Sequence, residues 1–226
     1  MQVGNKSYRV ETDIPEQVPV FPLSGALLLP GAQLPLNIFE PRYLAMFDDA
    51  MSSNRLIGVI QPALTDSKAA GKGPVEDLCQ VGCLGRITSF AETGDGRYVI
   101  TLGGVCRFRI GAELEQAGKP YRICQISAFL GDLEARDRGA EVDRKALLDS
   151  FKAYLEANDL EADWSSVERA STESLVNSLS MMSPYGPAEK QALLEADNLK
   201  VRAETLIAIT EIALARDSDE HGPVLQ

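Results

Sequence analysis

Apolar and polar residues alternate in short runs through the first 130 positions, and Gly, Pro or Asp bounds each run. A period of two is typical of β-strands with one buried face. Asp95 and Gly96 lie between two of these runs and predict a tight hairpin. The expected strands are VPVFPL (18–23), LPLNIF (34–39), RLIGVIQP (55–62), QVGCLGRITSF (80–90), RYVITLGGVCRFRI (97–110) and YRICQISAFL (121–130).

Helical periodicity appears at two places. One helix is expected near residues 41–52, where Pro41 suits the first turn. After residues 131–141 the apolar spacing becomes helical and remains so. The expected stripes are Leu147, Leu148, Phe151, Tyr154 and Leu155; Leu175, Val176, Leu179 and Met182; and Leu199, Ala203, Leu206, Thr210, Ala213 and Leu214.

Two further signals concern helix starts. Ser165 and Glu168 have the spacing of a capping box. Pro187 suits the first turn of a short helix that ends near Glu195.

These patterns predict an α+β protein in which the strands and most of the helices occupy separate parts of the chain. We expect a β-rich part over residues 1–130, a helical bundle over 131–217 and a disordered tail over 218–226. The charge follows the same division: residues 1–130 hold 12 Lys or Arg against 13 Asp or Glu, whereas residues 131–226 hold 10 against 20. The net charges are therefore −1 and −10. Because an acidic surface repels phosphate backbones, nucleic acid is not expected as a partner.

The hydropathy of the chain and its N-terminal residues indicate the cellular location that we expect. No apolar run approaches the roughly 20 residues that span a membrane. The N-terminal residues lack the charged, apolar and small-residue regions of a secretion signal. We expect a cytoplasmic protein without a membrane partner.

Residues that usually perform catalysis are scarce. His is the commonest general acid or base, and the single His, His221, lies in the expected tail. A phosphate-binding loop needs Gly-Lys followed by Ser or Thr, and neither Gly71-Lys72 nor Gly118-Lys119 meets this requirement. We therefore predict no catalytic residue and no cofactor.

The four cysteines lack the C-x-x-C spacing of zinc or redox motifs. Cys106 falls on the apolar face of an expected strand, which favours a buried thiol that packs as a small apolar residue. The alternative is a metal site that Cys106 would form with Cys79 and Cys83.

Three segments resemble one family. Residues 18–51, VPVFPLSGALLLPGAQLPLNIFEPRYLAMFDDAM, resemble the start of the N-terminal, substrate-recognition domain of the ATP-dependent Lon protease. Residues 81–110 resemble its β-hairpin block, and residues 175–210 resemble the helical segment that closes the domain in stand-alone bacterial members. The resemblance implies a PUA-like pseudo-barrel of strands followed by a helical bundle. It also implies a stand-alone bacterial member without the ATPase and Ser-Lys protease modules.

Two neighbouring elements are candidates for partner binding. Alternation cannot bury Leu27, Leu28 and Leu29 on one sheet face, so we expect at least one to be exposed, although burial under the helical part is the alternative. The other element is IFEPRY (38–43), where Glu40 and Arg42 can either stabilise a strand-to-helix junction or border a patch that receives an unfolded segment. The candidate partner-binding residues are Leu27, Leu28, Leu29, Pro30, Phe39, Glu40 and Arg42.

Other residues have simpler interpretations. Trp164, the single Trp, is expected to anchor packing, with a ligand platform as the alternative. Arg107 and Arg109 are expected to be solvated on one strand face, or to contact an acidic partner.

The leading hypothesis is a non-enzymatic module that binds exposed apolar or unfolded protein segments, or a protein of the proteolysis machinery. It would act as an adaptor or holder in proteolysis or quality control. The alternatives are a small hydrolase or protease with an unrecognised Ser-Lys or carboxylate site, and an RNA-binding protein of PUA-like fold.

Overall fold

The structure, a computed structural model, describes residues 1–63, 77–115, 118–134 and 139–220, with the backbone alone over 217–220. The chain divides into two compact units. The strand-rich unit comprises Met1–Ala135 and Tyr185–Leu194, and the helical unit comprises Arg136–Pro184 and Glu195–Gln226. The sequence analysis expected a helical bundle over 131–217, whereas this division groups residues 185–194 with the strands.

The six expected strands and the helix near residues 41–52 are confirmed. The strands are β1 (Gln2–Val3), β2 (Lys6–Ser7), β3 (Gln17–Pro22), β4 (Gln33–Ile38), β5 (Leu56–Ile60), β6 (Val81–Glu92), β7 (Tyr98–Leu114) and β8 (Arg122–Ala128). The helical segments of this unit are η1 (Glu11–Asp13), α1 (Pro41–Met51), η2 (Leu130–Leu133) and α5 (Pro187–Glu195). β1 and β2 were not predicted, because two-residue strands are too short to show a period.

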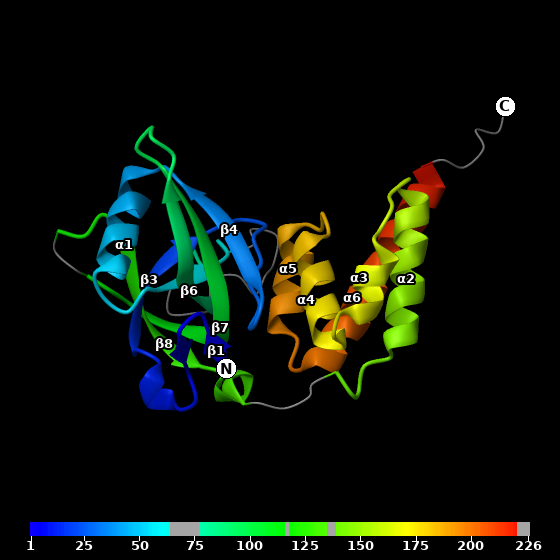
Figure 1. Ribbon diagram of the computed structural model, residues 1–226, viewed down its shortest axis with the longest axis horizontal. Coiled ribbons are helices and arrows are strands. Elements are labelled where there is room, and N and C mark those ends of the chain that lie inside the picture. The colour runs from blue at the N-terminus through cyan, green and yellow to red at the C-terminus, as the bar shows by residue number, and fades with distance from the viewer. Residues whose placement is uncertain (64–76, 116–117, 135–138, 221–226) are drawn as a thin grey trace. The chain divides into compact units, whose positions relative to one another are not determined.

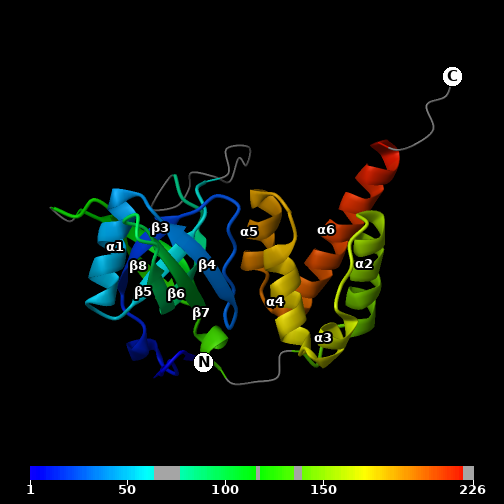
Figure 2. The same cartoon turned by 45° about the horizontal axis from the view of Figure 1, so that its top comes forward.

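Strand pairing in the main sheet closes on itself (Figures 1 and 2). The order is β4-β7-β6-β5-β3-β8, and the second half of β7 also pairs with β8. β3 and β5 are parallel, and the other pairs are antiparallel. The result is a ring of β3, β5, β6, β7 and β8, to which β4 is added along the first half of β7.

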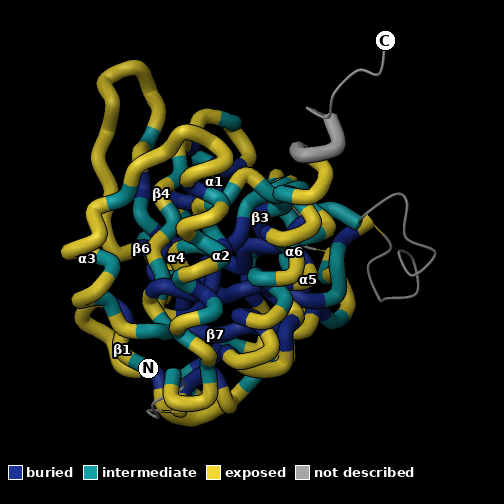
Figure 3. The backbone as a smooth tube through the Cα atoms, turned by 90° about the vertical axis from the view of Figure 1, so that its right-hand side faces the viewer, coloured by how far each residue is buried: buried dark blue, intermediate teal, exposed yellow. Residues whose placement is uncertain are grey.

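The interior of the ring is filled by apolar side chains of the strands, and residues 102–108 of β7 are all buried (Figure 3). Phe108 is fully buried at its centre. A Cβ atom at Gly82 would lie 2.5 Å from the Phe108 ring, so glycine at this position makes room for the aromatic side chain. The apolar positions predicted for β7 from Ile100 to Ile110 are buried, but the residues between 102 and 108 are buried as well, so this stretch of β7 is covered on both faces.

The helix α5 is joined to the strand-rich unit by buried polar contacts. The Gln61 side-chain amide donates to the Gln191 side-chain oxygen at 3.1 Å and to the Pro187 carbonyl at 2.9 Å. Gln191 in turn donates to the Val81 carbonyl at 3.1 Å. Because buried amides without partners are costly, these contacts fix the position of α5 on the strands.

The helical unit consists of α2 (Arg144–Ala157), α3 (Trp164–Arg169), α4 (Thr172–Met182) and α6 (Leu199–Glu220). Both α2 and α4 contact α6, as Figure 2 shows. The buried members of the expected stripes are Leu147, Leu155, Leu175, Val176, Leu199, Ala203, Leu206 and Thr210. Arg202 also lies in this core and donates to the Asn177 side chain at 3.2 Å.

Three details of the helical unit differ from the sequence predictions. Met182 is 82% exposed, because it is the last residue of α4. The cap of α3 is Asp163, whose carboxylate accepts from the backbone amides of Ser165 and Ser166, and not the expected pair of Ser165 and Glu168. Helix α6 extends to Glu220, three residues into the expected tail, and residues 221–226, with His221, lie outside the described residues.

Within the described residues, no helix has the length and apolar character needed to cross a membrane.

Candidate binding surface

The leucine loop is part of the interior. Leu27, Leu28 and Leu29 are 3%, 1% and 0% exposed, and Pro30 is also buried. The prediction that at least one of these leucines is exposed is therefore wrong. Burial is possible because this segment is a loop, whose successive side chains need not alternate between two sides.

Glycines in the strands let this loop approach closely. Two backbone hydrogen bonds join Gly104 of β7 to the end of the loop. The Gly31 amide donates to the Gly104 carbonyl at 3.0 Å, and the Gly104 amide donates to the Ala32 carbonyl at 2.9 Å. A Cβ atom at Gly104 would lie 2.0 Å from the Leu29 carbonyl oxygen, and one at Gly85 would lie 2.9 Å from Leu28. The loop is thus packed and hydrogen-bonded onto the sheet, which opposes its use as a contact surface.

The IFEPRY junction divides between the core and the surface. Ile38 and Tyr43 are buried, whereas Phe39 is 57% exposed. Glu40 is the N-cap residue of α1 and Pro41 occupies the first turn. Arg42 donates from Nε to the Glu40 carboxylate at 2.9 Å, and both side chains are about half exposed. The Glu40 side chain does not cap the helix, so its direct role is this ion pair.

Strand pairing places further residues on the side of the sheet that Phe39 occupies. Asn37 of β4 is opposite Val99 of β7, and Val99 is opposite Ala91 of β6. Directly paired residues share a face, and all three are exposed. The Arg97 guanidinium lies 5.8 Å from the centre of the Phe39 ring. We call these five residues, Asn37, Phe39, Ala91, Arg97 and Val99, the Phe39 face.

The opposite side of the same strands is covered by α1. Phe47 of α1 lies 4.5 Å from the Tyr98 ring and 5.5 Å from the Phe90 ring, between ring centres. Tyr43 packs on Phe21 of β3 at 4.1 Å. These aromatic contacts pack α1 against the side of the sheet opposite to the Phe39 face, and they stabilise the strand ends that carry this face.

A polar cluster anchors the last turn of α1. Lys119 donates to the Asp49 carboxylate at 2.7 Å, and the Tyr121 hydroxyl donates to the same oxygen. These hydrogen bonds hold the pKa of Asp49 below its ordinary value, because they favour the charged carboxylate.

The cysteines are mostly interior. Cys83, Cys106 and Cys124 are buried, and the Cys79 thiol donates to the Pro62 carbonyl at 3.3 Å. Burial raises the pKa of Cys106 to about 12 and that of Cys124 to about 11. Over the described part of the chain, no three His, Cys, Asp or Glu side chains gather in the manner of metal ligands.

Two arginines of β7 and the single Trp were the other candidates for partner contacts. Arg109 is exposed, but Arg107 is 5% exposed and is paired with Asp132 of η2, so the prediction that both are solvated is wrong for Arg107. Trp164 is 40% exposed, and its ring lies 6.2 Å from that of Phe151. It therefore packs on one side and faces solvent on the other.

A family model described as the ATP-dependent protease La (LON) substrate-binding domain matches residues 17–211. The chain belongs to this family. Among its curated relatives, Lon protease 2 of Myxococcus xanthus is 26% identical over 87% of this chain and 24% of the relative. Lon protease of Flavobacterium johnsoniae is 27% identical over 86% of this chain and 24% of the relative. The chain thus spans about a quarter of the length of these Lon proteases.

Solved structures show the same fold. A Lon N-terminal domain protein from Xanthomonas campestris superposes with a TM-score of 0.57 at 23% identity, over 85% of this chain and 97% of that one. The N-terminal domain of Lon protease from the Mycobacterium avium complex gives a TM-score of 0.61 at 20% identity, over 86% and 98%. The resemblance drawn from the sequence is confirmed. The relation to PUA-like folds and the designation of residues 131–217 as a bundle stay predictions.

Phe39 was a candidate from the sequence, whereas Val99 was not. In RYVITL, Tyr98, Ile100 and Leu102 occupy the apolar positions of the alternation, so Val99 is an apolar residue at a polar position. This break in the alternation could have indicated an exposed apolar side chain at position 99.

Proposed function

We propose that this chain is a non-enzymatic Lon-type module that binds exposed apolar segments of unfolded proteins at the Phe39 face. The observation that carries the proposal is the exposure of Phe39, at 57%, where β4 passes into α1. Val99, 43% exposed, adds apolar area on the same side of the sheet. Exposed apolar residues that are gathered and rimmed by polar groups are typical of protein contact sites.

Two polar residues next to Phe39 in the sequence, Glu40 and Arg42, could bind the backbone of an extended segment. Glu40 and Arg42 satisfy each other in an exposed ion pair, and such pairs contribute little to stability. They are therefore available to accept and donate hydrogen bonds to an extended segment at low cost. Phe39 and Val99 would take its apolar side chains.

Family membership supports binding of protein substrates but not a particular pathway. We propose a holder or adaptor role in cytoplasmic proteolysis or protein quality control, with a protein of the proteolysis machinery as a second partner. The ATP-dependent unfolding and peptide-bond cleavage that the name Lon protease describes are not part of this proposal. Leu27, Leu28, Leu29 and Pro30 are interior, so they are not proposed to contact the segment.

The test is calorimetric titration of the full chain with a reduced, carboxymethylated protein that cannot refold, compared with its folded form. We expect binding of the unfolded form only. Phe39→Ala should weaken that binding about tenfold, as expected for a central aromatic contact.

Val10→Ala is the matched control, because Val10 is 56% exposed in the same unit and lies outside the Phe39 face. It should bind as the unsubstituted chain does. Equal affinity for the folded and unfolded forms would contradict the binding function, and an unchanged affinity of Phe39→Ala would remove the Phe39 face as its site.

A further inference from the structure

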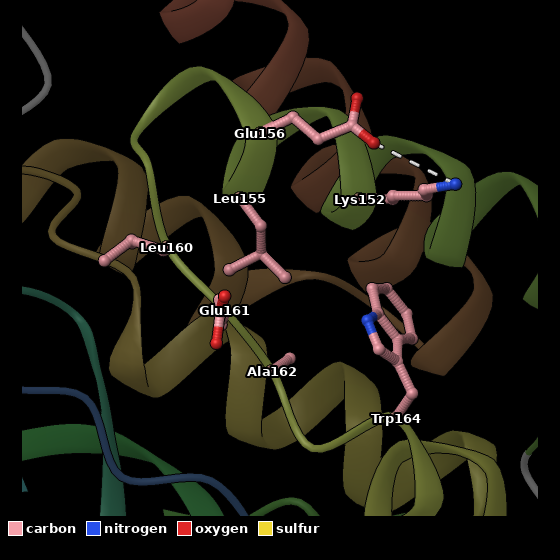
Figure 4. Close-up of a pocket in the computed structure, with 7 residues that line it drawn as sticks. All are labelled: Lys152, Leu155, Glu156, Leu160, Glu161, Ala162 and Trp164. Atoms are coloured by element: carbon pink, nitrogen blue, oxygen red, sulfur yellow. Dashed lines mark ion pairs between the residues drawn. The ribbon is translucent and has the colours of Figure 1, made fainter.

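A hollow of about 360 Å³ lies in the helical unit, between α2, the segment 158–163 and the start of α3 (Figure 4). Its apolar lining is formed by Leu155, Leu160, Ala162 and Trp164. Figure 4 shows Leu155 pointing from α2 toward the connecting segment and the Trp164 indole rising from α3 toward α2. This volume is at the lower end of the range for small binding pockets.

The lining is apolar yet open to solvent. Leu160 is 53% exposed and Trp164 is 40% exposed, whereas Leu155 at the base is 7% exposed. A single exposed leucine needs no explanation, and Figure 4 shows Leu160 at the far side of the hollow from Trp164. The apolar surface that faces the hollow is therefore formed mainly by Leu155 and the exposed indole. Trp is also enriched among residues that dominate binding energy.

Local hydrogen bonds hold this lining in place. The Leu160 amide donates to the Leu155 carbonyl at 2.9 Å, and the Asn158 side chain donates to the Tyr154 carbonyl at 2.8 Å. Asp159 takes a φ of 51°, which turns the chain away from α2. At the other end Asp163 accepts from the Ser165 and Ser166 amides. The exposed apolar side chains are thus ordered before any partner arrives, which lowers the entropic cost of binding.

The rim of the hollow is acidic. Glu156 and Glu161 line it, and residues 156–163, EANDLEAD, contain four carboxylates and neither Lys nor Arg. Lys152 lies 3.9 Å from Glu156 and offsets part of this charge. Hydrogen bonds from Ser166 and Ser165 lower the pKa of Asp163, so this carboxylate is charged at neutral pH.

We propose that this hollow binds a basic, apolar segment of a partner protein, with a Leu-type side chain against Leu155 and Trp164 and flanking Lys or Arg facing Glu156 and Glu161. Charge complementarity selects this occupant: an acidic segment would be repelled, and an uncharged apolar one would leave the carboxylates unused. A cation beside the exposed indole gains a further attraction from the ring. The site is independent of the Phe39 face, which lies in the other unit.

The single Trp makes the test direct, because the fluorescence of the whole chain reports on Trp164. The probe is a synthetic, Trp-free peptide with a leucine pair between two pairs of arginines. We expect a saturable blue shift of the emission, because the indole loses water contact. The affinity should fall in about 0.5 M salt, where charge attraction is screened within a few ångströms.

Matched peptides and variants separate the site from general attraction by an acidic protein. Peptides with glutamate in place of arginine, or glycine in place of leucine, should give no saturable shift. The double variant Glu156→Gln with Glu161→Gln should weaken binding about tenfold. The double variant Glu204→Gln with Glu211→Gln removes the same charge from exposed positions of α6 and should bind within about twofold of the original.

Two results would overturn the proposal: no saturable shift with the basic peptide, or an equal loss of affinity in the two double variants. Phe39→Ala should leave the fluorescence titration unchanged. Failure of the Phe39 face as a substrate site is therefore distinguishable from failure of this hollow.

Discussion

Arg107 of β7 and Asp132 of η2 form a buried two-point ion pair, with Nε–Oδ2 at 2.9 Å and Nη2–Oδ1 at 3.0 Å. The backbone amide of Arg107 also donates to Asp132, and Nη1 donates to the Leu194 carbonyl at 3.2 Å. One guanidinium therefore connects a central strand, the segment after β8 and the end of α5.

Asp132→Ala should lower the free energy of unfolding by about 3 to 5 kcal/mol, because the buried Arg107 charge loses its partner. Denaturant unfolding followed by circular dichroism measures this. Asp48→Asn, at an exposed position of α1, is the control and should change stability by less than about 0.5 kcal/mol. Replacing both partners, Arg107→Met with Asp132→Leu, should recover part of the loss, and no difference between Asp132→Ala and the control would contradict the account.

Leu28→Ala should destabilise the strand-rich unit by about 2 to 5 kcal/mol, because it leaves a cavity beside Gly85. The same unfolding measurement on Val10→Ala should give a change within about 0.5 kcal/mol, since that side chain is exposed. Unchanged stability of Leu28→Ala together with weaker capture of unfolded protein would restore the leucine loop as a contact surface.

Asp49 gives the strand-rich unit a defined dependence on acid. Its folded pKa is lowered, so its contribution to stability is complete above the unfolded pKa of about 4 and is lost as pH falls through the folded value. The melting temperature of Asp49→Asn should therefore lie below that of the unsubstituted chain at neutral pH, and the gap should close in strong acid. A gap that persists at a pH where the Asp49 carboxyl is protonated would mean that Asp49 stabilises by packing and not by charge.

Cys106 and Cys124 should not react with a thiol reagent in the native protein at mildly alkaline pH. Both are buried and their pKa values are raised, so the nucleophilic thiolate is scarce. Mass spectrometry after pulse labelling, with denatured protein as the control, measures this. The partly buried Cys79 is the site where any native labelling should appear, and rapid labelling of Cys106 would show that the ring opens.

Much of the fold follows from local periodicity. The strands and α1 were predictable because period-two runs and a Pro at a helix start are properties of neighbouring residues. The leucine loop was not, since its burial depends on Gly85 and Gly104, which lie far along the chain and remove two obstructing side chains.

Arg107 and α5 show the same limit. A strand pattern places Arg107 on the polar face, but Asp132 and Leu194, remote in sequence, cover that face and satisfy the charge. Pro187 predicts a short helix through Glu195 but does not indicate which surface buries that helix. For the candidate sites, Phe39 was accessible from the IFEPRY motif, whereas the exposure of Trp164 depends on how the segment 158–163 turns.

The position of α5 also governs how this protein can be cut for experiments. Residues 185–194 belong to the strand-rich unit although helices of the other unit flank them in sequence. A fragment that stops at residue 135 would deprive Gln61 and the Val81 carbonyl of their Gln191 partner and uncover the surface beneath α5. An autonomous fragment therefore needs the α5 sequence grafted back through a linker, so its design requires splicing two distant stretches.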